Sequence, residues 1–457
     1  MIYRPYEYQR TATRWILEHP RCGLFLDMGL GKTVATLTAV QQLMDDCEAS
    51  SVLVVAPKKV AETTWSTEAG KWDHLRGLRV SRVMGTQVQR KRALAAPADV
   101  YVIGRDNFAW LAGLYGGCLP FDVLVIDELT SFKNSKSQRF KAMKISTGAV
   151  PRVIGLTGTP APNGLIDLWG QMYCIDRGER LGPSVTRYRE TYFSTHKWNN
   201  IVVRCDVKPG CEEVIRERIA DICLSMQARD YLELPDMIIH AESVELAPAV
   251  MDGYHKFERE RVMEFERNHG QETGNILAAS AAALMNKLAQ YANGAVYDAD
   301  GEAHEVHEAK LERLAEIVEA AGSPVLVFYQ YRHDAARIAR RLRGYRVARY
   351  EGERQLREWN AGRIDVLLAH PASTAYGLNM QEGGHYIVWF GPGWDLELFQ
   401  QANARLHRQG QRHPVTVYKL LAAHTVDERA SAALEEKKSR QQSLLDGLNY
   451  LRRKYCK

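Results

Sequence analysis

The 457-residue chain is predicted to be an α/β protein with two doubly wound parallel-sheet domains. Short runs of apolar residues alternate with helical stretches over residues 20–160, and the same alternation resumes at Val325. Runs that are apolar throughout are typical of parallel strands buried on both faces. The chain is also too long for one ordinary hydrophobic core, so two or three domains are expected. Ligands of such sheets bind at the carboxyl ends of the strands.

Nine apolar runs are the predicted strands, and a mainly helical, more charged region from about residue 164 to 290 separates the two sets. Leu234-Pro235 is predicted to break the chain between its halves. The sequence therefore predicts a first domain over 1–232 with a helical insertion after residue 164, a second over 233–424 with a helical insertion near 245–295, and a C-terminal helix over 425–457. The predicted strands are Gly23–Leu26, Val52–Val55, Val100–Ile103, Val123–Ile126, Val153–Leu156, Val325–Phe328, Val366–Leu368, Tyr386–Trp389 and Val415–Tyr418.

Composition is that of a globular protein, with 46% hydrophobic and 25% charged residues. No apolar run approaches the roughly 18 residues needed to span a bilayer, and the N-terminus has no apolar signal core, so a cytoplasmic location without a membrane partner is expected. The net charge of +5 permits an acidic partner. Cys205, Cys211 and Cys223 are the closest cysteines, but they lack zinc-knuckle spacing, so reduced thiols are expected rather than a zinc site.

A glycine-rich segment follows the first predicted strand and precedes a helix-like stretch. Such a turn places backbone N–H groups at a helix N-terminus, where they bind phosphate. Its lysine can reach the β- and γ-phosphates and its threonine hydroxyl can ligate Mg²⁺. The usual phosphate-loop pattern has glycine where this chain has Leu26. The alternative interpretation is therefore a glycine turn that contains a lysine by chance and binds no phosphate. The segment consists of Met28, Gly29, Leu30, Gly31, Lys32 and Thr33.

Two further motifs follow strands of the first domain. Asp127 and Glu128 come directly after Val123–Ile126, where Asp127 is predicted to hold Mg²⁺ and Glu128 to orient the attacking water, beside the phosphate loop if the strands are neighbours. The alternative is a charged loop. Thr157, Gly158 and Thr159 follow the next strand. The hydroxyls of the two threonines are predicted to sense the γ-phosphate and transmit its loss to the other domain. The alternative is a plain turn.

The second domain ends in QANARLHRQGQ, residues 401–411, which contains two arginines three residues apart. On a helix Arg405 and Arg408 would share a face. Two arginines on one face can act as arginine fingers on a γ-phosphate across a cleft. The alternative is a basic surface helix.

Together these residues resemble the superfamily 2 helicase-like ATPases, and within them the Swi/Snf group of double-stranded DNA translocases. RPYEYQ at the N-terminus resembles the family's adenine-reading motif, with Gln9 as the reader. MGLGKT is that group's form of the phosphate loop, TGTP resembles its coupling motif, and QANARLHRQGQ resembles its QxxxRxHRxGQ. The resemblance implies two RecA-like lobes, a C-terminal bracing helix, ATP and Mg²⁺, with Gln9, Gly377 and Gln401 contributing to the nucleotide site.

The resemblance extends almost end to end and implies contacts with DNA phosphates. Val54–Lys58 with Trp65 resembles the first DNA-contacting motif, and by motif position alone the candidate DNA contacts are Lys58, Asn107, Gln330 and Thr374. Leu129-Thr130 replaces the common Ala/Gly-His after the carboxylates, which puts the link from that motif to the coupling motif in doubt. The compact core resembles small phage and bacterial members.

The expected function is therefore that of a DNA-dependent ATPase that translocates on duplex DNA without sequence preference. A monomer suffices, because both halves of the nucleotide site lie in one chain, and replication or recombination proteins are possible partners. Two alternatives stay open: a strand-separating DNA or RNA helicase, and a nucleotide-gated DNA-binding scaffold with little turnover.

Overall fold

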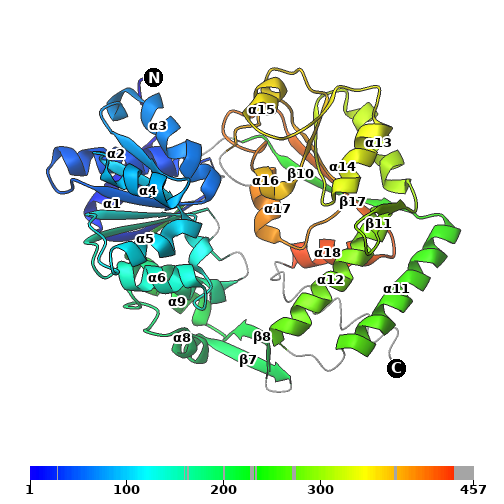
Figure 1. The fold of residues 1–457 in the computed structure, drawn as a ribbon, viewed down its shortest axis with the longest axis horizontal. Coiled ribbons are helices and arrows are strands. Elements are labelled where there is room, and N and C mark those ends of the chain that lie inside the picture. The colour runs from blue at the N-terminus through cyan, green and yellow to red at the C-terminus, as the bar shows by residue number, and fades with distance from the viewer. Residues whose placement is uncertain are drawn as a thin grey trace. The chain divides into compact units, whose positions relative to one another are not determined.

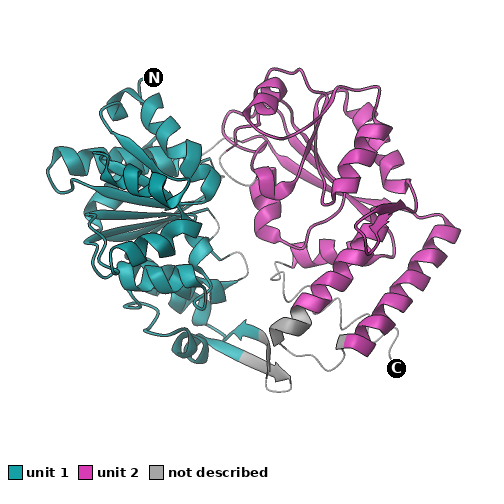
Figure 2. Cartoon of the chain, in the orientation of Figure 1, with its two compact units in different colours: residues 1–196, 204–233 teal, residues 197–203, 234–457 magenta. Residues whose placement is uncertain are grey.

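In a computed structural model of the chain, the described residues are 1–27, 29–158, 160–161, 164–198, 201–226, 231, 234–269, 274–374 and 378–436. The chain forms two compact units, shown in Figure 2. Unit 1 contains Met1–His196 and Arg204–Glu233, and unit 2 contains Lys197–Val203 and Leu234–Lys457. Each unit is built around its own parallel sheet.

Unit 1 contains a seven-stranded sheet in the order β3-β4-β2-β5-β6-β1-β9, with helices packed against it (Figure 1). Every pairing in it is parallel. The interior residues of its central strands are apolar because both faces are buried. The strands are β1 (Arg21–Leu26), β2 (Val52–Ala56), β3 (Val80–Val83), β4 (Val100–Gly104), β5 (Val123–Asp127), β6 (Arg152–Thr157) and β9 (Cys223–Met226).

The helices of unit 1 connect these strands, and a two-stranded sheet of β7 (Phe193–Trp198) and β8 (Ile201–Val207) follows α8. A core formed by residues such as Phe108, Phe140 and Trp169 joins α5, α6 and α7 to the sheet. The helices are α1 (Glu7–Glu18), α2 (Lys32–Asp45), α3 (Trp65–Lys71), α4 (Gln87–Ala95), α5 (Phe108–Leu114), α6 (Gln138–Ser146), α7 (Leu168–Asp176), α8 (Val185–Tyr192) and α9 (Cys211–Ile219).

Unit 2 contains a six-stranded parallel sheet in the order β10-β17-β16-β13-β15-β14. Val325 and Val327 of β13 enter one apolar core, whereas Leu326 and Phe328 enter a second core on the opposite face. This alternation explains why the strand reads as one continuous apolar run. The strands are β10 (Met237–Val244), β13 (Val325–Phe328), β14 (Val347–Arg349), β15 (Val366–Ala369), β16 (Tyr386–Trp389) and β17 (Val415–Ala422).

Two long helices, a hairpin and the helix α13 precede β13, and shorter helices follow it. The hairpin consists of β11 (Ala295–Tyr297) and β12 (Ala303–Glu305). The helices of unit 2 are α11 (Pro248–His269), α12 (Gly274–Ala292), α13 (Ala309–Ala321), α14 (Arg332–Arg341), α15 (Glu353–Asn360), α16 (Pro371–Thr374), α17 (Leu396–Asn403) and α18 (Val426–Glu435). Among the described residues, no helix is long and apolar enough to cross a bilayer.

A buried polar network fastens α18 to the rest of unit 2. The Lys310 ammonium on α13 pairs with the Asp427 carboxylate and donates to Asn293 Oδ1 at 2.7 Å. Asn293 Nδ2 donates in turn to Asp334 Oδ2 at 3.0 Å, and the same oxygen accepts from the backbone N–H of Tyr331 at 3.1 Å. The side chains of Lys310 and Asp427 are 0% and 2% exposed, so their charges depend on these partners.

The prediction of two parallel α/β sheets is confirmed, but four of the sheet strands were not predicted. The region 164–290 was predicted to be mainly helical, yet it contains β9 and β10 as well as the β7–β8 hairpin. These strands, with β3 and β14, lie at the ends of the two sheets or outside them. An edge strand has one solvent-facing side, so it keeps polar residues and lacks the continuous apolar run of a central strand.

Candidate functional site

Three predicted motifs meet at one edge of the unit 1 sheet. The phosphate-loop segment follows β1, Thr157 ends β6, and Asp127 ends β5. We expected the carboxylates beside the loop if their strands were neighbours, but β6 lies between β5 and β1. Because the three strands are parallel, their carboxyl ends still lie at the same edge. The Lys32 ammonium is close enough to Asp127 to lower the pKa of that carboxyl electrostatically, against a larger opposing effect of burial.

The phosphate loop has the backbone that its glycines allow. Gly29 and Gly31 have φ values of 87° and 71°, in the left-handed region that favours glycine. Gly31 caps α2, which begins at Lys32 and continues through Thr33. The Lys32 ammonium donates to the carbonyl oxygens of Leu26 at 2.5 Å and Asp27 at 3.2 Å. The Lys32 side chain therefore bends back onto the start of its own loop. Leu30, in the same loop, is buried. Met28 lies outside the described residues.

Gln9 packs directly against this loop. Its Oε1 accepts from the Tyr6 backbone N–H at 3.0 Å, and its side chain is held at the start of α1. A Cβ added at Gly31 would come within 2.5 Å of Gln9 Nε2, so the amide group lies over the loop backbone. The predicted adenine reader and the predicted phosphate loop are thus brought together.

Asp127 is partly buried, and its two oxygens have separate donors. Trp65 Nε1 donates to Oδ2 at 2.9 Å, and the Glu128 backbone N–H donates to Oδ1 at 3.0 Å. Burial raises the pKa of Asp127, whereas the Trp65 hydrogen bond and the Lys32 charge oppose that rise. A carboxylate held in this way suits a cation that offsets the cost of its burial, and with the Thr33 hydroxyl it supplies the oxygen ligands that Mg²⁺ prefers.

Trp65 has a different place from the one its motif suggested. The sequence assigned it only to a motif that resembles the first DNA-contacting motif, and in the structure its side chain is fully buried. The indole N–H orients Asp127 instead, a role that sequence reasoning missed because the two residues are far apart in the chain.

Glu128 has an unusual backbone for a residue with a side chain. Its φ of 56° lies in the left-handed region, which costs free energy and is concentrated at functional sites. The Thr130 hydroxyl donates to Glu128 Oε1 at 3.3 Å. Thr130 thus contacts the glutamate from the position where the family's common form has histidine.

The coupling motif is partly described. Thr157 is fully buried at the end of β6, and Gly158 follows it. Thr159 lies outside the described residues. The Pro160 carbonyl accepts from Gln171 Nε2 on α7 at 2.5 Å, which ties the end of this motif to the helical layer.

Lys58 and Asn107 lie together at the same edge of the sheet. They follow β2 and β4, which are neighbours, and a Cβ at Gly104 would lie 3.8 Å from both Asn107 Nδ2 and Lys58 Cα. The Lys58 side chain is 75% exposed, and Asn107 Oδ1 accepts from Arg90 Nη1 at 2.5 Å. The structure thus brings these two predicted DNA contacts close together at this edge.

The predicted arginine fingers lie in unit 2, but not on a common helix face as expected. Helix α17 ends at Asn403, so Arg405 and Arg408 lie in the turns after it. Beyond the helix end, the Arg405 carbonyl accepts from the Met380 N–H at 3.3 Å. Arg405 Nε donates to the Gln401 carbonyl at 2.9 Å, and Arg408 Nη1 to the Leu378 carbonyl at 3.0 Å.

The remaining predicted residues of unit 2 differ in exposure. Gln401 is buried and donates from Nε2 to Glu397 Oε1 at 3.1 Å. Gln330 follows β13 and is partly exposed beside Gly393. Thr374 is fully buried, and its hydroxyl donates to the Pro371 carbonyl at 3.0 Å. Gly377 lies outside the described residues.

Comparison with known proteins identifies the family. The model of the SNF2-related domain matches residues 8–293, and that of the helicase conserved C-terminal domain matches residues 309–410. The chain belongs to the SNF2-related family of helicase-like ATPases. This confirms the resemblance of the sequence to the Swi/Snf group of superfamily 2.

Three similar proteins show how far the likeness extends. Putative protein p41 of Acyrthosiphon pisum secondary endosymbiont phage 1 is 35% identical over 98% of this chain and 99% of its own length. The mouse DNA repair and recombination protein RAD54-like is 23% identical over 97% of this chain, which spans 66% of that protein. The Hef helicase domain of Pyrococcus furiosus has a TM-score of 0.52 at 17% identity, covering 95% of this chain and 100% of that structure, a likeness of fold alone.

Proposed function

We propose that this SNF2-family member is a DNA-dependent ATPase that translocates on double-stranded DNA without separating its strands. The observation that carries the proposal is the sheet edge of unit 1. There a lysine at a helix N-terminus, a partly buried aspartate with two donors and a glutamate in a strained backbone follow strands whose carboxyl ends lie at one edge. The name of the RAD54-like relative supports DNA as the partner.

In the proposed cycle, each group of unit 1 has one task. Lys32 leaves the carbonyls of Leu26 and Asp27 for the β- and γ-phosphates. Thr33 and Asp127 would hold Mg²⁺, which neutralises developing phosphate charge. Glu128 orients the attacking water.

Unit 2 would supply the remaining groups. Arg405 and Arg408 are the proposed arginine fingers, with Gln401 and Gly377 as further nucleotide contacts, and an arginine finger contributes about 10³–10⁵ in rate. In unit 1, Gln9 would contact the adenine base. Thr157, Gly158 and Thr159 would transmit the state of the γ-phosphate. If duplex DNA favours the hydrolysing arrangement of the units, it stimulates turnover by a population shift.

DNA would be held by its phosphates, with Lys58, Asn107, Gln330 and Thr374 as proposed contacts. A phosphate-based contact is sequence-tolerant and weakens as salt rises. The Thr374 hydroxyl donates to the Pro371 carbonyl, so its contact requires that α16 rearranges.

The first test measures ATP hydrolysis with no nucleic acid, duplex DNA, single-stranded DNA and RNA. Duplex DNA should stimulate most, and a strand-displacement assay should give no product. Lys32→Ala and Glu128→Gln should abolish hydrolysis, and Arg408→Ala should retain ATP binding but stop turnover. Lys141→Ala, an exposed lysine of α6, is the matched control. Hydrolysis by Lys32→Ala would refute the site, displacement would favour a helicase, and binding without turnover would favour a scaffold.

A further inference from the structure

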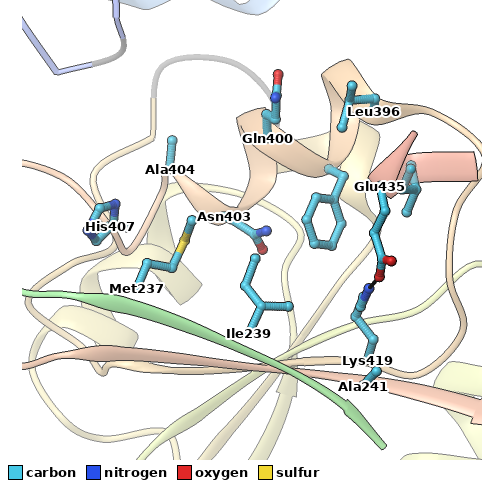
Figure 3. A pocket seen from close by; sticks show the side chains of 12 residues that line it. Met237, Ile239, Ala241, Leu396, Gln400, Asn403, Ala404, His407, Lys419 and Glu435 are labelled. Carbon is cyan, nitrogen blue, oxygen red and sulfur yellow. Dashed lines mark hydrogen bonds and ion pairs between the residues drawn. The ribbon is translucent and has the colours of Figure 1, made fainter. Parts of the chain in front are cut away.

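An apolar groove lies along β10 in unit 2, beneath α17 (Figure 3). It has a volume of about 450 Å³, and Met237 forms part of its floor. Gln400 and Ala404 also line it. These two residues adjoin Gln401 and Arg405 in the chain, which are proposed to contact the nucleotide. The groove therefore lies within the region already proposed for hydrolysis, whereas a contact in unit 1 reaches beyond that region.

A short turn after β4 in unit 1 reaches across to the segment that follows the water-orienting glutamate. The turn is a 3₁₀ helix over Arg105–Asn107. Arg105 Nη1 donates a hydrogen bond to Ser131 Oγ, and Ser131 is the third residue after Glu128. β2 lies between β4 and β5 in the sheet. The bond therefore joins loops that follow two strands which are not neighbours.

Ser131 belongs to the turn that fixes Glu128. The Ser131 N–H donates to the Glu128 carbonyl at 2.9 Å, and the Thr130 hydroxyl donates to Glu128 Oε1 at 3.3 Å. Leu129 and Phe132, in the same turn, are fully buried in the unit 1 core. A residue other than glycine keeps a φ of 56° only when its surroundings fix that backbone. These contacts therefore help to hold the strained glutamate in place.

The other end of the Arg105–Asn107 turn carries a proposed DNA contact. Asn107 Oδ1 accepts from Arg90 Nη1 at 2.5 Å, and the Arg90 guanidinium lies over the Trp110 ring, 4.1 Å from its centroid. Arg105 and Asn107 are both half-buried. The turn has only three residues. The side chain proposed to contact DNA and the side chain that bonds to Ser131 therefore belong to one small, anchored unit.

A DNA phosphate at this edge of the sheet would add order to the turn. Lys58 and Asn107 lie close together there, since each has an atom 3.8 Å from a Cβ placed at Gly104. A phosphate bound by both side chains would restrict the turn, and the Arg105 bond would pass that restriction to the Glu128 turn. A misplacement of about 1 Å in a reacting group can cost about 10² in rate. A small gain in the order of Glu128 is therefore enough to regulate hydrolysis.

We propose that Arg105 and Ser131 are positioning residues that link DNA binding near Lys58 and Asn107 to the placement of Glu128. The proposal rests on the proposed ATPase function and names one way in which DNA regulates it. With DNA bound, the ordered turn would hold Glu128 where it orients the attacking water. DNA would then raise kcat through this link and leave the affinity for ATP unchanged.

Ser131→Ala tests the link, because it removes the acceptor of the Arg105 bond and keeps the backbone of the turn. In the full-length chain, ATP turnover with saturating duplex DNA should fall about tenfold, whereas turnover without DNA should change less than about twofold. The KM for ATP and the Kd for duplex DNA, measured by fluorescence anisotropy, should also stay within about twofold. Ser81→Ala is the matched control. Its half-buried hydroxyl on β3 donates to the Ala93 carbonyl at 2.8 Å, and its loss should leave the stimulation by DNA unchanged.

The outcomes separate this link from the proposed function. Equal stimulation of Ser131→Ala and the parent by duplex DNA would overturn the link alone. A loss of turnover that is the same with and without DNA, or that comes with weaker binding of ATP or DNA, would show a structural role and also overturn the link. If duplex DNA does not stimulate the parent, the proposed function fails as well.

Hydrogen exchange followed by mass spectrometry tests the link without hydrolysis. Saturating duplex DNA should slow exchange in a peptide spanning residues 123–133 of the parent at least about threefold. In Arg105→Met, which removes the donor to Ser131, DNA should still bind but exchange in this peptide should stay unchanged. A peptide from α9 is the internal control and should not respond to DNA in either protein. Slowing of the same size in the parent and the variant, or no slowing in the parent, would refute the link.

Discussion

Replacing Lys310 by methionine should destabilise unit 2 strongly and leave unit 1 unaffected. The lysine is 0% exposed, and it donates to Asn293 Oδ1 at 2.7 Å and pairs with Asp427, whose side chain is 2% exposed. Methionine has a similar length but no charge, so Asp427 would lose its cation and keep the Ala422 N–H at 3.0 Å. Removing one member of a buried ion pair costs about 3–5 kcal/mol.

Native-state hydrogen exchange followed by mass spectrometry measures this cost in each unit separately. Amides of β13 and β16 should lose about 3–5 kcal/mol of protection, while those of β2 and β5 in unit 1 serve as the internal control. The additional substitution Asp427→Asn should recover part of the loss, because it removes the stranded charge. A loss below about 1 kcal/mol in unit 2, or an equal loss in both units, would refute the reasoning.

Three further predictions concern single side chains. Trp65→Phe keeps an aromatic ring, though a smaller one, and removes the indole N–H donated to Asp127, so ATP turnover should fall about tenfold and require more Mg²⁺ in a titration. Burial lowers the pKa of His307 from 6.5 to about 4, so the unfolded chain binds a proton at this residue before the folded chain does as pH falls. The free energy of unfolding of unit 2 should therefore fall by about 3 kcal/mol between pH 6.5 and pH 4, and urea unfolding of His307→Gln should show no such fall. Gly31→Ala should weaken ATP binding, measured by titration, at least about tenfold, because the new Cβ would meet Gln9 Nε2 and the residue would have to keep a left-handed backbone.

The central strands were predictable because burial on both faces leaves a strong local signal. Val325–Phe328 was predicted within the same bounds that the structure has. β10 was missed because most of its side chains are exposed and its pattern is mixed. The end of α17 was also missed: the spacing of Arg405 and Arg408 suits a helix, but both residues lie in turns after Asn403, where Arg405 bonds to Met380 of a distant segment.

In the candidate site, too, some features could be predicted from the sequence and others could not. The residues of the phosphate loop and the Asp127-Glu128 pair were evident in the sequence, because their chemistry requires particular side chains in fixed order after a strand. The sequence did not reveal the hydrogen bond from Trp65 to Asp127 or the position of Gln9 over Gly31, because each contact joins segments that are distant in the chain.

The sequence by itself determined the family, the two parallel sheets and the identity of the residues that would act on a nucleotide. These depend on short motifs and on local apolar periodicity, which neighbouring residues carry. Only the tertiary structure decided that β6 separates the carboxylates from the phosphate loop, that Trp65 is buried against Asp127, and that an apolar groove remains along β10. Strand order and burial depend on contacts between distant segments, which no local pattern specifies.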